Sequence, residues 1–174
     1  MSTKILITKE QISQKVNELA QKITKDYHGK DLVLIGILDG AYILIADLSR
    51  ELFSLGLKDM EVTFLGLSSY GSNRESSKNP KITKDLRLDI TDRNVLIVED
   101  IVDTGWSLDF LIRLLKQRNP ASIKTLVLLS KPQRREISLK LDYIGFEIEN
   151  KWVEGYGLDT DYKGRANPNI IERV

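Results

Sequence analysis

Two adjacent carboxylates, Glu99 and Asp100, stand where an uninterrupted apolar run, residues 95–98, comes to an end. Such a run predicts a strand that is buried on both faces, as in a parallel sheet. Open α/β sheets bind their ligands at the carboxyl ends of the strands. We therefore expect these two side chains to line a binding site, where carboxylates can hold hydroxyl groups or a metal ion.

A polar loop follows two residues later and leads into a helix-like segment, residues 108–115. Backbone N–H groups at the start of a helix are unpaired, and the helix dipole favours negative charge there, so the loop predicts a cradle for one phosphate group. The chain contains neither G-x-x-x-x-G-K-[ST] nor G-x-G-x-x-G, which excludes two common nucleotide-binding motifs. The loop consists of Asp103, Thr104, Gly105, Trp106 and Ser107.

The first part of the chain alternates between helix and strand patterns. Thr8 and Gln11 have the spacing of a capping box, which predicts the start of a helix that ends near Gly29. Buried strands are expected over residues 32–38 and 62–67. Between them we expect a helix with one apolar face. Its inward-facing residues are Ile45, Leu48, Leu52 and Phe53.

Residues 68–81 are polar, rich in Ser and without an apolar period. They are either a disordered excursion or a lid over a site, and the sequence alone favours neither. Beyond them Leu86, Leu88 and Ile90 alternate with polar residues, which indicates an edge strand or a hairpin partner.

The second part predicts a strand over residues 122–129, a short helix over 133–139, a strand over 143–148 and a loop-rich tail. We find no internal repeat and no linker. The alternation of strands and helices predicts an α/β fold, with a twisted, mostly parallel sheet and helices on both faces. We expect a single domain over residues 1–174.

Composition narrows the class of function. The 174 residues carry a net charge of +1, with 41% hydrophobic and 29% charged residues, so nothing indicates nucleic-acid binding. The absence of Cys and the single His argue against disulfides, a thiol nucleophile and a His-based triad or zinc site. No apolar run is long enough to span a membrane, and no signal-peptide region is apparent. We expect a cytoplasmic protein.

The apolar run followed by E-D-I-V-D-T-G-x-S resembles the phosphoribosyl-pyrophosphate signature of the type I phosphoribosyltransferases. Further segments resemble the hypoxanthine-guanine (6-oxopurine) branch of that family, over nearly the whole chain. The resemblance implies the type I fold with a small hood, built from residues 149–174 and the N-terminal segment. The segments begin at Leu38, Ser68, Lys131 and Trp152, and Arg165 follows the last of them.

For the phosphate end of the site, the resemblance implies that Glu99 and Asp100 hold the ribose hydroxyls and Mg²⁺. Residues 103–107 would bind the 5′-phosphate. Asp103 would also take a proton from purine N7, or stabilise it there. The pyrophosphate would be bound by Leu38, Asp39, Gly40 and Arg165.

For the purine end, the resemblance implies that Lys131 donates to the 6-oxo group and that Trp152 stacks on the base. The backbones of Val153 and Asp159 would read the 2-position, and the Asp159 side chain is a candidate ligand for a second Mg²⁺. The lid over residues 68–81 would begin with Ser69 and Tyr70.

The implied reaction belongs to purine salvage. Hypoxanthine, guanine and in some cases xanthine would react with 5-phosphoribosyl 1-pyrophosphate to give IMP, GMP or XMP and pyrophosphate, in a homodimer or homotetramer. Two alternatives remain open at this point. One is a regulator that keeps the pocket but binds nucleic acid or a protein, and the other is an enzyme acting on a pyrimidine or adenine.

Three departures from the family pattern bear on these expectations. Asp39 stands where a basic residue is frequent, which weakens the case for pyrophosphate affinity, and the Leu38–Asp39 bond is a candidate for a non-proline cis peptide. Trp106 occupies the variable loop position without an evident role in phosphate binding. Glu154 stands in a usually apolar position, which predicts a more polar edge of the base pocket.

Overall fold

The computed structural model describes residues 3–70 and 76–173. Its centre is a six-stranded sheet in which every described pairing is parallel except that between its first two strands. The predicted α/β class with a mostly parallel sheet is therefore confirmed. In spatial order the sheet consists of β4 (Ser76–Lys84), β3 (Glu61–Tyr70), β2 (Val33–Leu38), β5 (Asn94–Val102), β6 (Ser122–Ser130) and β7 (Tyr143–Glu147).

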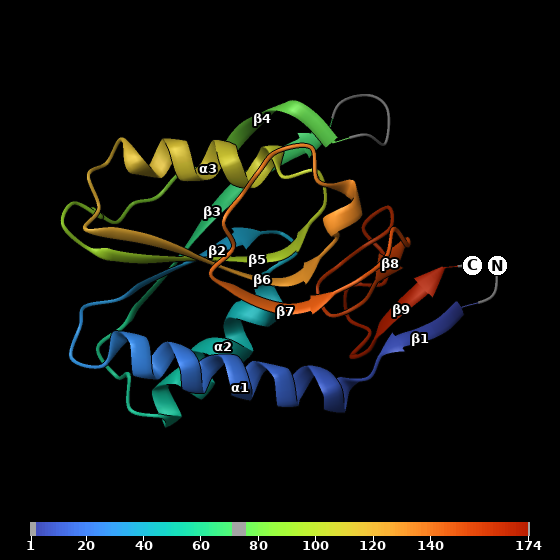
Figure 1. Ribbon diagram of the computed structural model, residues 1–174, viewed down its shortest axis with the longest axis horizontal. Helices are drawn as coiled ribbons and strands as arrows, with labels where there is room; N and C mark the ends of the chain where they lie inside the picture. Colours follow the sequence, from blue (N-terminus) through green and yellow to red (C-terminus); the bar gives the residue numbers. More distant parts are fainter. Residues whose placement is uncertain (1–2, 71–75, 174) are drawn as a thin grey trace.

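Helices cover both faces of this sheet, as the sequence predicts (Figure 1). Helices α1 (Lys9–Tyr27) and α2 (Tyr42–Ser54) lie together against one face, and α3 (Trp106–Lys116) lies on the opposite face. An apolar core lies on each face of the sheet. Successive residues of a strand pack into opposite cores, because side chains alternate across a strand. Leu96 of β5 belongs to the core beneath α1 and α2, whereas Val95 belongs to the core beneath α3.

The starts and faces of the helices mostly follow the sequence. The Thr8 hydroxyl accepts from the Gln11 N–H and the Gln11 side chain accepts from the Thr8 N–H, so the predicted capping box is present. The apolar face of α2 is buried at three of its four predicted positions, but Phe53 is 53% exposed. Phe53 follows Leu52 directly, so it lies about 100° away from the buried stripe.

After β3, the described strands differ from those that the sequence predicts. Residues 76–81, expected in a polar lid, belong to β4, which pairs antiparallel with β3. Residues 71–75 of the predicted lid lie outside the described residues. The predicted edge strand around Leu86, Leu88 and Ile90 is absent from the described strands, because this alternating segment packs onto the core beneath α3 without pairing in the sheet.

The short helix predicted over residues 133–139 is also wrong. Only one 3₁₀ turn, η1 (Pro132–Arg134), forms after β6. The chain then leaves the helical path, because the Glu136 N–H donates to the Thr104 carbonyl 3.0 Å away instead of to a carbonyl of its own segment. This bond holds the residues after β6 against the start of α3.

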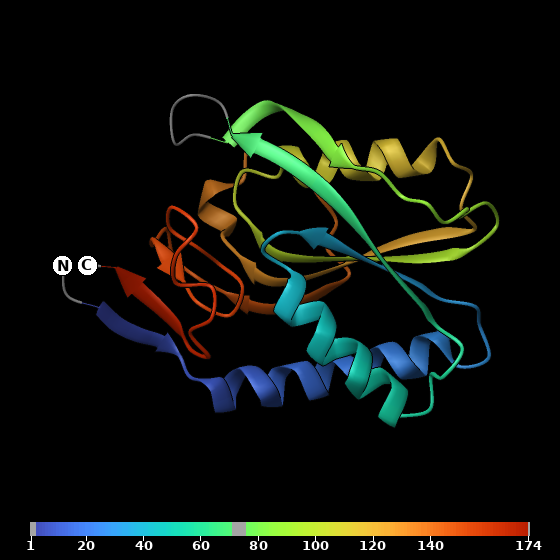
Figure 2. The ribbon, with the colours of Figure 1, turned by 180° about the vertical axis from the view of Figure 1, so that it is seen from behind.

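The hood is a separate three-stranded antiparallel sheet at one end of the molecule (Figure 2). It joins the two ends of the described chain, and Thr3 lies opposite Arg173 in its register. No helix in the described part of the chain is long and apolar enough to cross a membrane. In spatial order the hood strands are β1 (Thr3–Ile7), β9 (Ile170–Arg173) and β8 (Val153–Glu154).

Candidate active site

Glu99 and Asp100 lie near the carboxyl end of β5, the strand at the centre of the parallel part of the sheet. Burial raises the pKa of Glu99 well above its ordinary value, and the neighbouring Asp100 charge raises it further. Burial also raises the pKa of Asp100. The Glu99 Oε2 atom is buried, and among the described residues it has no hydrogen-bond partner. Two desolvated carboxylates with unused oxygen lone pairs suit a cation better than a structural role.

The loop after β2 is pressed onto these carboxylates. The Leu38–Asp39 peptide bond is cis, the isomer for which the sequence marked it as a candidate. A Cβ atom added to Gly40 would lie 1.8 Å from Asp100 Oδ2, so no other residue fits at this point without displacing the carboxylate. The structure thus brings the predicted pyrophosphate loop and the acidic pair into direct contact.

The loop between β5 and α3 has the conformation of an anion cradle. Gly105 occupies the N-cap position of α3 with φ +97°, in the left-handed region that favours glycine. Thr104 is buried, and the backbone N–H groups of the first helical turn begin directly after it. The indole N–H of Trp106 donates to Glu136 Oε2 at 2.9 Å. Trp106 therefore fastens the phosphate loop to the segment after β6, a role that the sequence did not reveal.

Asp103 and Lys131 meet at the same end of the sheet. Lys131, one residue beyond β6, is only 7% exposed, and its backbone N–H donates to the Val102 carbonyl at 3.0 Å. Burial lowers the pKa of Lys131, while the nearby Asp103 charge opposes this change. Asp103 accepts a hydrogen bond from the Nε atom of Arg134 at 2.9 Å. Sequence reasoning missed Arg134, because nothing local indicates that η1 turns back onto this loop.

The hood contributes an aromatic face and a buried strand. The Trp152 side chain is 50% exposed, and its indole N–H donates to Thr160 Oγ1 at 2.7 Å, which fixes the orientation of the ring. Val153 is buried in β8. Glu154 is buried as well, but its carboxylate pairs with Arg173 at 2.9 Å and packs against Gly164. The charge of Glu154 is thus paired within the hood, although its Oε2 atom makes no hydrogen bond among the described residues.

Arg165 lies close to two other predicted site residues, Asp39 and Asp159. Its Nη2 atom lies 2.9 Å from Asp159 Oδ1 and 3.8 Å from Asp39 Oδ2, and its Nη1 atom donates to the Gly157 carbonyl at 2.6 Å. Asp159 also accepts from the Tyr162 backbone N–H at 2.7 Å. The guanidinium therefore lies beside the Leu38–Ala41 loop, in a position to meet an anion bound there.

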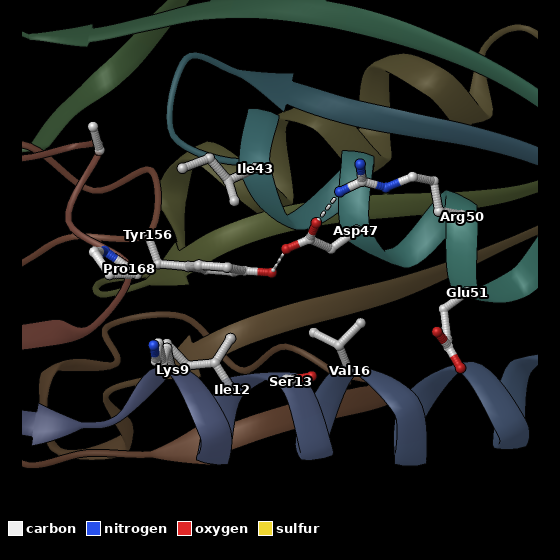
Figure 3. A pocket seen from close by; sticks show the side chains of 11 residues that line it. Lys9, Ile12, Ser13, Val16, Ile43, Asp47, Arg50, Glu51, Tyr156 and Pro168 are labelled. Carbon is white, nitrogen blue, oxygen red and sulfur yellow. Dashed lines mark hydrogen bonds and ion pairs between the residues drawn. The ribbon is translucent and has the colours of Figure 1, made fainter.

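The hood rests on the body of the protein through Gly157 and Tyr156. A Cβ atom on Gly157 would lie 2.0 Å from the Gly40 carbonyl oxygen. The neighbouring Tyr156 is 6% exposed, and its hydroxyl donates to Asp47 Oδ2 of α2 at 2.7 Å (Figure 3). Asp47 also pairs with Arg50, and these groups border a cavity of about 500 Å³ between α1, α2 and the hood. None of the predicted catalytic residues lines that cavity.

Most predicted site residues are thus gathered at the carboxyl ends of β2, β5 and β6 and in the adjoining hood. The exceptions are Ser69 and Tyr70, which end β3 and whose side chains lie outside the described part of the structure. Among the described residues, no group of three or more His, Cys, Asp or Glu side chains is placed to enclose a metal ion.

The fold and this site define a class of protein. The sequence model of the phosphoribosyl transferase domain matches residues 2–161, and the chain belongs to the phosphoribosyltransferase family. Within the family, the chain is 41% identical to the hypoxanthine-guanine phosphoribosyltransferase of Dictyostelium discoideum, over 99% of this chain and 96% of that protein. It falls in the hypoxanthine-guanine branch.

A solved structure supports the same placement. The hypoxanthine-guanine phosphoribosyltransferase of Bacillus anthracis superposes with a TM-score of 0.91 at 38% identity, over 98% of each chain. The chain is also 38% identical to the Bifunctional protein TilS/HprT of Listeria innocua. In that case the match covers 96% of this chain but only 25% of the longer relative, so the chain spans about a quarter of its length.

Proposed function

We propose that this protein transfers the phosphoribosyl group of 5-phosphoribosyl 1-pyrophosphate to N9 of hypoxanthine or guanine. We propose xanthine as a third acceptor. The C1′–O bond to pyrophosphate breaks, the C1′–N9 bond forms, and the N7 proton passes to Asp103. The products are IMP, GMP or XMP and pyrophosphate. The observation that supports the proposal is the close approach of Gly40 to Asp100, next along the chain to the loop that begins α3, since the segments proposed to bind pyrophosphate, ribose and phosphate then adjoin one another.

The phosphate end holds the sugar and its two anionic groups. Backbone N–H groups and hydroxyls of residues 103–107 bind the 5′-phosphate at the start of α3. The Leu38–Ala41 loop and Arg165 bind pyrophosphate, and Arg165 offers a planar fork that matches its oxygens. For this contact Arg165 leaves Asp39 and Asp159 in part, so these carboxylates compete with the leaving group.

The acidic pair fits Mg²⁺. Glu99 and Asp100 are hard oxygen ligands, and the buried Glu99 Oε2 atom lacks a partner among the described residues. Two protein carboxylates are enough, because Mg²⁺ usually keeps several waters and shares substrate oxygens. The ion supplies charge neutralisation for pyrophosphate as it leaves. We propose Asp159 as a ligand of a second Mg²⁺ in the closed state, once Arg165 has turned to pyrophosphate.

The purine end selects the base. The buried Lys131 donates to the 6-oxo group, which disfavours adenine because its amino group would face another donor. Trp152 stacks on the base with its ring held by Thr160, and the backbones of Val153 and Asp159 read the 2-position. The lid over residues 68–81, with Ser69 and Tyr70 at its start, excludes water that would otherwise capture C1′.

The assembly is part of the same proposal. We propose that each chain forms one phosphoribosyltransferase domain and that the chains assemble into a homodimer or homotetramer, as the resemblance to the family implies. Tyr42 and Phe53 of α2 and Val62 of β3 are exposed apolar side chains, and we propose them as candidates for contacts between subunits. Light scattering of the purified protein tests this assembly, and a monomer at micromolar concentration contradicts it.

A base panel tests the reaction. Purified protein with Mg²⁺ and 5-phosphoribosyl 1-pyrophosphate is assayed on hypoxanthine, guanine, xanthine and adenine. We expect turnover of the 6-oxopurines and a loss of about 100-fold or more in kcat for Asp103→Ala. Asp109→Ala is the matched control, because Asp109 carries a similar ion pair with Arg113 on the exposed side of α3. Silence on all four bases from folded protein overturns the proposal.

A further inference from the structure

Arg134 faces the phosphate loop because two backbone turns fix its place relative to Lys131. The Arg134 N–H donates to the Lys131 carbonyl at 3.1 Å, and the Arg135 N–H donates to the Pro132 carbonyl at 3.2 Å. Pro132 opens this turn with a φ that is set in advance by its ring. The direction in which Arg134 leaves the chain is therefore coupled to the residue proposed to read the purine 6-oxo group.

The segment after β6 is also fastened to the loop that carries Asp103. Glu136 accepts from the Trp106 indole at 2.9 Å through Oε2, and its backbone N–H donates to the Thr104 carbonyl at 3.0 Å. These two bonds lie within the phosphate loop, at the residues on either side of Gly105, and hold residues 132–136 against the loop. Arg134 thus meets Asp103 across a fixed junction, rather than as the end of a freely moving surface side chain.

The contact uses one specific pair of atoms. The Arg134 Nε atom donates to Asp103 Oδ1 at 2.9 Å, and both side chains remain partly open, with exposed fractions of 45% and 36%. A carboxylate held through one oxygen still offers the other to a ligand. Lys131 senses both charges, since Asp103 raises its pKa and Arg134 lowers it. Asp103 and Arg134 are thus in contact, and both lie near enough to Lys131 to act on its charge.

We propose that Arg134 is a positioning residue for the transfer reaction. It holds Asp103 through Oδ1 in the rotamer that directs Oδ2 to purine N7. The inference rests on the proposed function, and it follows the general arrangement in which a catalytic base is oriented by a third group. During the forward reaction the N7–H bond breaks, the proton moves to Asp103 Oδ2, and Arg134 stays bound at Oδ1. No other atom changes its bonding through Arg134.

The effect of Arg134 on folding stability can be measured separately from its effect on the chemical step. A partly exposed ion pair contributes little to folding stability, so its loss leaves the fold intact. An imprecisely placed base slows the chemical step while substrate binding elsewhere stays the same. Arg134 therefore acts on kcat with hypoxanthine and not on KM for 5-phosphoribosyl 1-pyrophosphate, because the Asp103 carboxylate that it holds is not among the groups proposed to bind that substrate.

The test compares Arg134→Met and Arg134→Lys with the native sequence. We expect Arg134→Met to lower kcat about tenfold while KM for 5-phosphoribosyl 1-pyrophosphate stays within about twofold. Arg134→Lys should restore part of the loss, because it keeps the charge but not the planar donor. Arg113→Met is the matched control, since it removes an Arg–Asp pair at the same 2.9 Å distance within α3 that does not involve Asp103, and its kcat should not change.

A double-mutant cycle with Asp103→Asn provides the second readout. If Arg134 acts through Asp103, Arg134→Met has no further effect on kcat in the Asp103→Asn background. Equal losses in both backgrounds overturn the inference, as does a kcat at or above that of the native sequence for Arg134→Met. If the native protein itself turns over no 6-oxopurine, the proposed function fails instead, so the two failures are distinguishable.

Discussion

The floor of the site, residues 95–107, and the hood differ in how the chain holds them. The floor includes β5, which pairs with β2 on one side and β6 on the other, and the first turn of α3. The hood is a three-stranded sheet of its own, joined to the body near Gly157 and Tyr156 and by a bond from the Lys9 N–H to Asn169 Oδ1.

The two halves of the proposed site therefore differ in how firmly the fold holds them. The proposed sugar and phosphate sites lie on elements that cannot shift without breaking the central sheet. The proposed base site and Arg165 lie in the hood, which can shift if a few contacts to the body change. We therefore expect the phosphate site to stay rigid while the base site adapts, and variants at the junction should reveal the adjustable half.

The largest effect is expected for Gly157→Ala. Its new Cβ would clash with the Gly40 carbonyl at 2.0 Å, and the φ of +101° is strained for alanine, so the hood must move away from the Leu38–Ala41 loop. We expect kcat/KM to fall about 100-fold. Gly56→Ala is the matched control, because its φ is +103° with nothing within 4 Å of the added atom.

Steady-state kinetics and thermal unfolding of both glycine variants check this prediction. Similar losses of stability with a loss of activity only at Gly157 would show that hood position, rather than backbone strain, controls turnover. If Gly157→Ala retains full activity, the hood is not held in place by this contact and the comparison between the two regions fails.

A smaller effect, on stability, is expected in the floor for Glu99→Gln. Burial and Asp100 raise the pKa of Glu99, so the folded protein binds this proton more tightly than the unfolded chain does. Its contribution to stability is present at acidic pH and is lost as pH rises through the raised pKa. In metal-free buffer we therefore expect the variant to be about 1 kcal/mol more stable than the native sequence at neutral pH, while it loses activity.

Urea unfolding with a chelator at several pH values measures that gain. The gain should grow from acidic to neutral pH, because the Gln side chain does not titrate. A constant difference, or a variant that is less stable at neutral pH, would contradict a raised pKa at Glu99.

The smallest effect is expected for Tyr156→Phe, which removes only the hydroxyl that donates to Asp47. The ring stays buried, so we expect a rise of about threefold in KM for the base and little change in kcat. Tyr143→Phe is the control, because Tyr143 is also buried and donates to an Asp, but it lies in β7 outside the site. Equal effects of the two variants on KM would mean that this bond does not set hood position.

The sequence predicted the floor well and the connections between segments poorly. The apolar run, the acidic pair and the polar loop before α3 are contiguous, so their local periodicity and turn chemistry were sufficient. The parallel sheet followed from the alternation of helices and strands. Most of the site residues that the resemblance named lie at one end of the sheet and in the adjoining hood, and their roles are proposals.

The errors came from tertiary contacts that override local pattern. Leu86 and Leu88 alternate like a strand but pack onto a core as irregular chain, whereas polar residues 76–81 pair with β3. The Arg134–Asp103 and Trp106–Glu136 contacts join residues about 30 apart in sequence. Pro132 signals a turn directly after Lys131, but nothing in the local sequence shows that the turn leads back to the loop between β5 and α3.

The pairing of Thr3 with Arg173 brings the two ends of the described chain side by side in the hood (Figures 1 and 2). A short peptide could join them into a ring, and new ends could then be opened at the α2–β3 connection, far from the hood. Such a circular permutant would keep every strand neighbour of the floor. It would also prevent fraying at β1 and β9, so that the base-binding half would gain order without any change in the residues that contact substrate.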